Sequence, residues 1–241
     1  MNLQRTTSLG GLVLIFAAIV TLVVVGLTIG STSDKSPFER DEVAEFLSDT
    51  HDKEGGIAAG IAVAIFNDGV MGPLMAAVFY VLFRDRNPLL ATIALLGIGI
   101  GSTLALMSDA ANILLLGIAE DFVKGGAGDV AAGDAASLQL GRFFGALTFV
   151  LFNTAFTAYG TALVAIGTLL VGPAGRLNPP KWLGWLAIVA GLSAWLAWGV
   201  VVADPMFVFF PINLLTTTVF SLGLGWWLLQ HGDLEPAPMN A

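Results

Sequence analysis

Asp68 lies near the middle of an apolar stretch that runs from Gly55 to Phe83. The stretch is long enough to cross a bilayer, for which about 20 apolar residues suffice. A charged side chain at the bilayer centre costs roughly 2.5 to 3.5 kcal/mol on insertion scales, so such groups usually face a bundle interior, a partner or water. A carboxylate at that depth can bind and release a proton or hold a cation. We therefore expect Asp68 to be the centre of any functional site.

Further polar side chains lie beside Asp68 or within the other apolar stretches. Arg142 and Asn153 are eleven positions apart, about three helical turns, so a helix places them on one face. Asn213 and Thr217 share a face at i, i+4 spacing. The candidate solute- or ion-binding residues are Asn67, Asp68, Asp109, Asn112, Arg142, Asn153, Asn213 and Thr217. One interpretation is a polar cavity that is open to the outside and has Asp68 at its floor.

The alternative interpretation of these polar residues is structural. Asp68 is then neutral or hydrogen-bonded to Asn67 or Asn153, and Arg142 reaches the membrane interface or pairs with Asp109. Asparagine and threonine side chains often hydrogen-bond across membrane helices and hold them together. Both interpretations place the polar groups inside a helix bundle.

The composition is that of a polytopic membrane protein. Of the 241 residues, 56% are hydrophobic and 12% are charged, which no ordinary soluble domain approaches. Lipid requires that backbone polar groups are satisfied internally, so the spans must be helices. The sequence predicts an all-α membrane helix bundle in which residues 1–241 form a single membrane domain. We expect about six transmembrane helices, at about residues 10–29, 55–83, 88–119, 140–171, 182–202 and 206–229.

A short amphipathic helix is expected in the first outer loop. Ser36-Pro37-Phe38-Glu39 matches a capping box with proline at the first helical position. Apolar residues that include Val43 and Leu47 follow at roughly helical spacing. An acidic polar face favours packing on the rim of the protein over binding to anionic lipid.

Glycine and proline predict local features of the longer helices. Gly72-Pro73 predicts a kink just past Asp68, because proline lacks a backbone donor and clashes with the preceding turn. Gly97-x-x-x-Gly101 and Gly141-x-x-x-Gly145 predict close approach of neighbouring segments. The third apolar segment is longer than a span requires, so it either tilts and projects beyond the bilayer or breaks around Ser108-Asp109. A loop follows it, from Asp121 to about Asp134.

Several kinds of chemistry are excluded by residue type. The chain has no cysteine, so it has no thiolate nucleophile, disulfide or cysteine-ligated metal. His51 and His231 both lie outside the spans, which argues against haem held by two buried histidines. No lysine lies in a span to form a retinal Schiff base, and no convincing nucleophile motif is present. We therefore expect no catalytic residues, no metal and no cofactor. A membrane enzyme that acts on lipid or quinone, with Asp68 as general acid or base, stays as a less favoured alternative because no nucleophile or metal set accompanies Asp68.

The lysines and arginines of the short loops predict the orientation. With the N-terminus inside, the compact loops that hold Arg84 with Arg86, and Arg176 with Lys181, lie on the cytoplasmic side. We therefore expect a multi-pass protein of the cell membrane with both termini in the cytoplasm. In this orientation the candidate polar residues concentrate in the outer half of the bundle.

The order of elements resembles an uncharacterised family of six-helix prokaryotic membrane proteins, a domain of unknown function. The resemblance implies an integral membrane fold and no known activity. It rests on Asp68 together with four short stretches: Leu9-Gly10-Gly11-Leu12-Val13-Leu14, Glu120-Asp121-Phe122-Val123-Lys124, Pro180-Lys181-Trp182-Leu183-Gly184-Trp185 and Trp226-Trp227-Leu228-Leu229-Gln230.

Two functions fit these features. In the first, the bundle binds or translocates a small solute, a proton or a cation through the outward-facing cavity, and Asp68 is the titrating group. In the second, the protein is a structural or accessory membrane subunit whose polar residues serve helix packing and whose acidic loops contact a partner. The expected partners are the lipid bilayer, a small solute or proton, and a membrane protein or a second copy of the chain. Nucleic acid is not expected, because the chain has no basic stripe.

Overall fold

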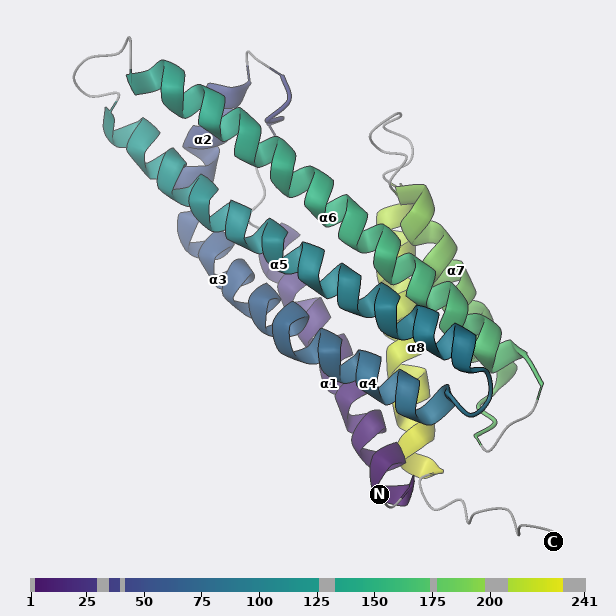
Figure 1. The fold of residues 1–241 in the computed structure, drawn as a ribbon. Helices are drawn as coiled ribbons and strands as arrows, with labels where there is room; N and C mark the ends of the chain where they lie inside the picture. The colour runs from purple at the N-terminus through teal and green to yellow at the C-terminus, as the bar shows by residue number, and fades with distance from the viewer. Residues whose placement is uncertain are drawn as a thin grey trace, which may run out of the picture. The chain divides into compact units, whose positions relative to one another are not determined.

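The described part of the chain consists of helices joined by turns, bends and short irregular segments (Figure 1). A computed structural model describes residues 3–29, 35–39, 42–125, 133–173, 177–197 and 208–231. No strand occurs among them, which confirms the all-α prediction. The helices are α1 (Leu3–Ile29), α2 (Val43–Asp52), α3 (Glu54–Phe66), the π-helix η1 (Asn67–Met71), α4 (Gly72–Phe83), α5 (Pro88–Gly125), α6 (Gly133–Val171), α7 (Lys181–Ala197) and α8 (Phe209–Gln230).

Five stretches of the described residues are long and apolar enough to cross a membrane. They are Thr7–Leu27, Glu54–Phe83, Pro88–Gly125, Ala135–Val171 and Phe209–Gln230. The membrane class is therefore confirmed, and these stretches correspond to five of the six predicted spans. The other predicted span, 182–202, corresponds to α7, an apolar helix of 17 residues, or about 25 Å. Residues 198–202 of that span, and residues 206–207 of the next, lie outside the described part.

The third apolar segment is one continuous helix. Of the two alternatives for this segment, a break around Ser108-Asp109 is wrong, because α5 runs without interruption from Pro88 to Gly125. The helix also ends later than the predicted residue 119, so the predicted loop from Asp121 begins too early. Lys124 forms an ion pair with Glu120 at i, i+4 spacing, a pair that supports one further helical turn.

The predicted amphipathic helix is present, but it begins later than expected. Its capping box is wrong: α2 starts at Val43, and residues 35–39 form bends instead. The Ser36 hydroxyl accepts a hydrogen bond from the Phe38 N–H (3.2 Å), and the Glu42 carboxylate accepts one from the Ser36 N–H (2.8 Å). These contacts form a turn before the helix. In α2 itself, Val43 and Leu47 are buried, as an amphipathic helix requires.

The second span contains a π-helical turn that includes Asp68. The sequence predicts a kink at Gly72-Pro73, and the distortion lies immediately before it, at Asn67–Met71. In a regular α-helix, Pro73 would leave the carbonyl of Gly69 without a donor and its ring would clash with that carbonyl. In the structure the five residues before Gly72 form the π-turn instead, and α4 restarts at Gly72 with Pro73 in its first turn. π-helical turns are rare, and those that occur are often found at functional sites.

The chain divides into two compact units. The first contains Met1–Thr21, Asn67–Thr103 and Asn153–Ala241, and the second contains Leu22–Phe66 and Leu104–Phe152. Each unit is described by itself. That residues 1–241 form a single membrane domain stays a prediction.

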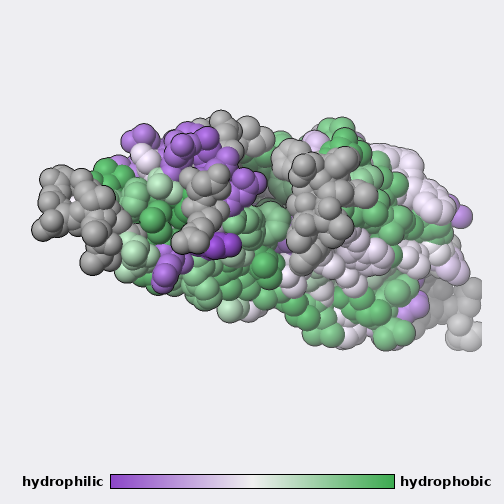
Figure 2. Space-filling view, turned by 90° about the horizontal axis from the view of Figure 1, so that it is seen from above, coloured by the Kyte–Doolittle hydropathy of each residue, from purple (hydrophilic) through white to green (hydrophobic). Residues whose placement is uncertain are grey.

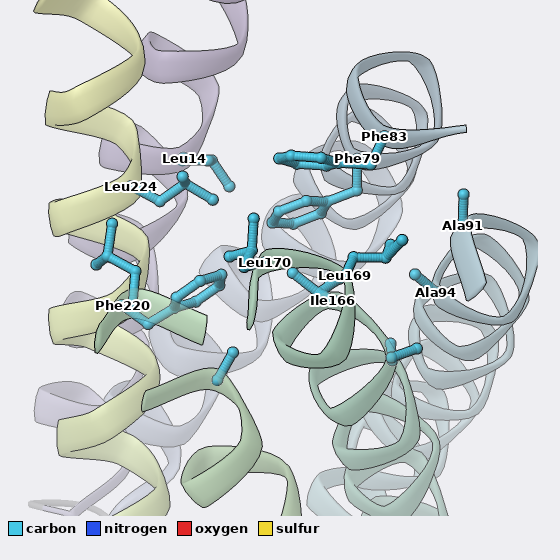
Figure 3. Packing of buried hydrophobic residues seen from close by; sticks show 14 of the residues in the cluster. Leu14, Phe79, Phe83, Ala91, Ala94, Ile166, Leu169, Leu170, Phe220 and Leu224 are labelled. Atoms are coloured by element: carbon cyan, nitrogen blue, oxygen red, sulfur yellow. The ribbon is translucent and has the colours of Figure 1, made fainter. Parts of the chain in front are cut away.

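Each unit has its own apolar core. In the first unit, side chains from α1, α4, α6 and α8 converge (Figure 3). Phe79 stacks on Phe83 and on Phe220, with ring centroids 6.3 Å apart in both pairs, and Leu14 and Leu224 lie beside them. In the second unit the buried cluster is smaller and consists of Val43, Leu47, Leu115 and Ala119.

Large apolar side chains are exposed on the long helices. Hydrophobic residues cover much of the face shown in Figure 2, and strongly hydrophilic ones gather in separate groups. Leu89 is 68% exposed, Leu215 is 67% exposed and Phe143 is 60% exposed. Exposed side chains of this size and number fit contact with lipid tails. Trp182 at the start of α7 and Trp226 near the end of α8 are also exposed, as expected of tryptophans at a membrane interface.

Glycines let the helices of the first unit touch backbone to backbone. A Cβ on Gly191 of α7 would lie 2.4 Å from the carbonyl oxygen of Gly160 on α6, and a Cβ on Gly167 would lie 2.5 Å from that of Gly184. A Cβ on Gly97 of α5 would lie 2.8 Å from the Ala158 oxygen of α6. The close approach predicted for Gly97-x-x-x-Gly101 is therefore confirmed.

The Gly141-x-x-x-Gly145 pattern of the second unit also serves close packing. A Cβ on Gly141 would lie 2.9 Å from the Leu47 side chain, and one on Gly145 would lie 2.5 Å from Pro37. The segment that precedes α2, and α2 itself, therefore pack directly on α6. This contact holds Pro37 and α2 against α6 within their unit.

We predict that Gly191→Ala lowers the stability of the protein. The added methyl group would overlap the Gly160 backbone, and overpacking of this kind typically costs about 1–3 kcal/mol. Gly99→Ala is the matched control, because no atom lies within 4 Å of its would-be Cβ. Unfolding in detergent, followed by circular dichroism, compares the two variants. Equal melting temperatures for Gly191→Ala and Gly99→Ala would contradict the packing described here.

Candidate functional site

Asp68 lies near the middle of the helical stretch that α3, η1 and α4 form together. It is the second residue of η1 and lies close to the midpoint of the 30-residue span Glu54–Phe83. At about 1.5 Å per residue, it is about 20 Å from either end. The central position that the sequence predicts for Asp68 is thus found. Its side chain is half-buried.

The carboxylate of Asp68 accepts hydrogen bonds from two side chains. The Tyr159 hydroxyl of α6 donates to Oδ1 over 2.9 Å, and the Asn67 amide donates to the same oxygen over 3.3 Å. The Ser102 hydroxyl of α5 lies 3.0 Å from the Tyr159 oxygen. Because a tyrosine has one hydroxyl hydrogen and Tyr159 gives it to Asp68, Ser102 is the donor in that contact. The result is a chain of hydrogen bonds that runs from Ser102 to Tyr159 to Asp68.

A half-buried arginine aligns the ends of the three helices that meet at Asp68. Arg86 lies in the turn between α4 and α5, and its guanidinium donates to the carbonyl oxygens of Gly172 (2.9 Å) and Leu177 (3.4 Å). Burial lowers the pKa of Arg86 from its ordinary value, and an arginine still keeps its charge at neutral pH. These bonds tie the turn to the residues just after α6.

Helix lengths then place the polar groups at one depth. The distances along the helix axes are measured from the end of the bundle that Arg86 ties together. At about 1.5 Å per residue, Asp68 lies about 22 Å from Phe83 and Ser102 lies about 21 Å from Pro88. On α6, Tyr159 lies about 18 Å from Val171 by the same measure. Three helices therefore bring their polar side chains to the same level of the bundle.

Two glycines make room for these polar contacts. A Cβ on Gly72, the first residue of α4, would lie 2.0 Å from the Ser102 hydroxyl oxygen. A Cβ on Gly101 would lie 3.0 Å from the Tyr159 ring. Glycine at 72 is thus what allows the Ser102 hydroxyl to reach its position beside Tyr159.

The predicted site residues fall into both units. Asn67, Asp68, Asn153, Asn213 and Thr217 belong to the first unit, and Asp109, Asn112 and Arg142 belong to the second. The structure brings Asn67 to Asp68, as one of the two interpretations of the sequence has it. The outward-facing cavity shared by all eight residues stays a prediction, because these residues are divided between the two units.

Within the first unit, the other predicted polar residues are spread along α6 and α8. Asn213 is buried and its amide donates to the Ala190 carbonyl of α7 over 2.6 Å, which is the helix-linking role of the structural interpretation. Asn153 is buried on α6. The Thr217 hydroxyl is buried and has no hydrogen-bond partner among the described residues.

Within the second unit, the predicted residues differ in exposure. Asp109 is buried on α5 and Asn112 is half-buried one turn later. Arg142 is exposed near the start of α6. The predicted pairing of Arg142 with Asp109 stays a prediction.

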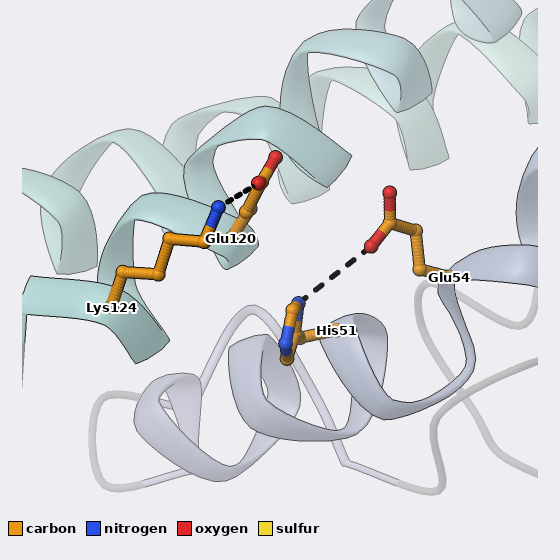
Figure 4. Close-up of polar contacts among 4 residues, drawn as sticks. All are labelled: His51, Glu54, Glu120 and Lys124. Atoms are coloured by element: carbon orange, nitrogen blue, oxygen red, sulfur yellow. Dashed lines mark hydrogen bonds and ion pairs between the residues drawn. The ribbon is translucent and has the colours of Figure 1, made fainter.

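Charged groups of the second unit gather where α2, α3 and the end of α5 meet (Figure 4). His51 Nδ1 lies 3.8 Å from a carboxylate oxygen of Glu54, and Lys124 pairs with Glu120. Glu54 and Lys124 are exposed, while His51 and Glu120 are half-buried. Ion pairs that reach solvent in this way contribute little to stability. Among the described residues, no three His, Cys, Asp or Glu side chains are grouped closely enough to hold a metal ion.

Tyr159 and Ser102 were not predicted as site residues from the sequence. Both lie in apolar spans, and each has a signal that could have found it. Tyr159 is one of the two tyrosines in the chain, and a tyrosine hydroxyl in the middle of a span needs a hydrogen-bond partner. Ser102 follows directly on Gly101, which the glycine pattern already marks as a point of close helix approach.

Comparison with known proteins identifies a family but no activity. The family described as Domain of unknown function (DUF4386) matches residues 9–232. No curated protein and no solved structure matches the chain. The resemblance to an uncharacterised membrane family is thereby confirmed. Since the match spans nearly the whole sequence, this chain belongs to the DUF4386 family.

Proposed function

We propose that this protein binds or translocates a small solute, a proton or another cation in the cell membrane, with Asp68 as the titrating group. The protein is a helical membrane protein of the DUF4386 family. The observation that carries the proposal is the pair of donors, Tyr159 and Asn67, that converge on one Asp68 oxygen at the middle of a span. Hydrogen bonds to the charged form of a carboxyl group stabilise that form.

The packing alternative explains this arrangement less well. Helix packing in the first unit is achieved by glycine contacts and by the Asn213 amide, none of which places a charge in the membrane. An asparagine at position 68 could accept the same bond from Tyr159 without the roughly 2.5 to 3.5 kcal/mol that a carboxylate costs at that depth. A carboxylate adds one property that an amide lacks, which is the capacity to gain and lose a proton.

The proposed site consists of Asp68 and the side chains hydrogen-bonded around it, namely Asn67, Tyr159 and Ser102. Arg142, Asp109 and Asn112 belong to the other unit. Within the described part of the chain, the hydrogen bonds to the Asp68 side chain come from Asn67 and Tyr159, which belong to the first unit. A site built on one unit keeps its geometry from its own helix contacts. The proposed site is thus narrower than the set of residues that the sequence suggests.

The proposed orientation places both termini in the cytoplasm. Arg84 is exposed in the turn after α4, where positive charge marks a cytoplasmic loop. Arg86 contributes charge to the same turn although it also binds carbonyl oxygens. Arg176, which also supports this orientation by its positive charge, lies outside the described residues.

Single cysteines test this orientation on a natural background that has none. We expect Glu45→Cys to react with a membrane-impermeant maleimide on right-side-out vesicles, because residue 45 is exposed and belongs to the proposed outer loop. Asp85→Cys, exposed in the turn after α4, should react only after the vesicles are opened. The reverse pattern would show that the termini are outside.

Asp68→Asn tests the proposed function directly. We expect proteoliposomes of the wild-type protein to show a pH-dependent flux of protons, Na⁺ or K⁺, and we expect Asp68→Asn to lower that flux at least about tenfold, since the amide cannot titrate. Asp109→Asn, at a buried acid of the other unit, is the matched control and should leave the flux unchanged. Circular dichroism establishes that both variants fold.

Two results would contradict the proposal. One is an unchanged flux in folded Asp68→Asn, which would remove Asp68 from the function. The other is a wild-type protein that moves none of the three ions and whose Asp68 carboxyl never changes its protonation. The second result would leave the accessory-subunit alternative, for which a stable partner should be recovered after extraction in mild detergents.

A further inference from the structure

We infer that the ligand of Asp68 is a proton, and that Tyr159 and Ser102 are positioning residues that hold its ionised form. This inference rests on the proposed function and specifies the ion. Three observations within the first unit carry it: the direction of the hydrogen-bond chain, an unused acceptor on Asn67, and the hydrogens of Tyr159 and Asn67 that already point at the carboxylate.

The hydrogen-bond chain ends on the carboxylate. Ser102 is 3% exposed and donates to the Tyr159 oxygen, and Tyr159 donates to Asp68 Oδ1. Polarisation along such a chain strengthens the last bond, because the tyrosine oxygen that accepts from serine donates more strongly. Both donors therefore favour the ionised carboxylate, and they hold it at a depth where lipid offers no hydrogen bond.

Asn67 supplies a buried acceptor that a protonated Asp68 carboxyl can use and an ionised one cannot. Its amide nitrogen donates to Asp68, while its Oδ1 atom is buried and has no hydrogen-bond partner among the described residues. A buried acceptor without a donor is unfavourable. When Asp68 takes up a proton from water, one O–H bond forms on the carboxyl group, and that O–H can donate to Asn67 Oδ1. Protonation thus supplies a hydrogen that this cluster lacks.

The same cluster is poorly suited to a metal cation. Hard cations such as Ca²⁺ and Mg²⁺ take about six or more oxygen ligands. Among the described residues of this unit, one carboxylate serves the site, and the hydrogens of Tyr159 and Asn67 already point at its Oδ1 atom. On α6 the titratable group that faces Asp68 is the Tyr159 phenol, and α5 contributes the uncharged Ser102 hydroxyl. A proton needs one oxygen, whereas a metal ion would have to displace these donors.

Infrared spectroscopy of the full chain in liposomes tests the inference with protons, Na⁺ and K⁺ as the probes. The signal is the C=O band of protonated Asp68, assigned by its loss in Asp68→Asn. We expect the band to grow as pH falls and to keep its midpoint pH when choline is replaced by Na⁺ or K⁺ at constant ionic strength. Tyr159→Phe removes a hydrogen bond to the ionised form, so the midpoint should rise by about one to two pH units.

Three further single variants and one double variant test the chain of donors. Tyr80→Phe changes the other tyrosine of the chain, whose ring lies against the Arg84 guanidinium. This variant should leave the midpoint unchanged. Gly72→Ala should raise the midpoint slightly and by the same amount as Ser102→Ala, because a Cβ at 72 would lie 2.0 Å from the Ser102 oxygen and turn it away from Tyr159. In Ser102→Ala, adding Gly72→Ala should cause no further shift.

The possible outcomes separate this inference from the proposed function. A midpoint that falls as Na⁺ or K⁺ is added would show a cation competing for the carboxylate, which overturns the proton assignment and leaves the proposed function standing. An unchanged midpoint in Tyr159→Phe would overturn the role of the hydrogen-bond chain. If no Asp68-dependent band changes between about pH 4 and pH 10, both the inference and the titrating role of Asp68 fall.

Discussion

A carboxylate halfway along a membrane-length helix must receive its hydrogen bonds from the protein, because hydrocarbon provides no donors. In this chain the donors are the Tyr159 hydroxyl and the Asn67 amide, and Ser102 supports the tyrosine from a third helix. Much of the first unit follows from this requirement. Helices that are distant in sequence have to meet at one depth, and they have to approach closely enough for short side chains to touch.

Two features of the sequence meet that requirement. Arg86 ties the turn between α4 and α5 to the end of α6, so that similar lengths of helix lead from this end to each polar group. Gly72 and Gly101 then remove the side chains that would separate Ser102 and Tyr159 from their partners. The π-turn that precedes Gly72-Pro73 lies at the same place. The backbone irregularity and the carboxylate therefore belong to one structural feature.

The sequence predicted the parts of this protein that follow from composition and periodicity. Apolar length located the spans, the cost of charge in lipid singled out Asp68, and glycine spacing predicted the approach of α5 to α6. Residues whose roles depend on a distant partner were not predictable in this way. Tyr159 and Ser102 are 57 positions apart and Tyr159 and Asp68 are 91 apart, and no local pattern relates them. The start of α2 was misplaced because Glu42, rather than the predicted cap, organises the turn.

A double-mutant cycle between Asp68 and Tyr159 tests the central contact most directly. Asp68→Ala, Tyr159→Phe and the double variant are compared with the wild type by reversible unfolding in lipid bicelles, at a pH where the carboxyl group is ionised. Neutral hydrogen bonds between membrane helices average about 0.6 kcal/mol in such cycles, whereas bonds to charged groups contribute about 1.5–3 kcal/mol. We predict a coupling energy above about 1 kcal/mol. A coupling energy near zero would show that the Tyr159 hydroxyl does not stabilise Asp68, and the account of this site would then be wrong.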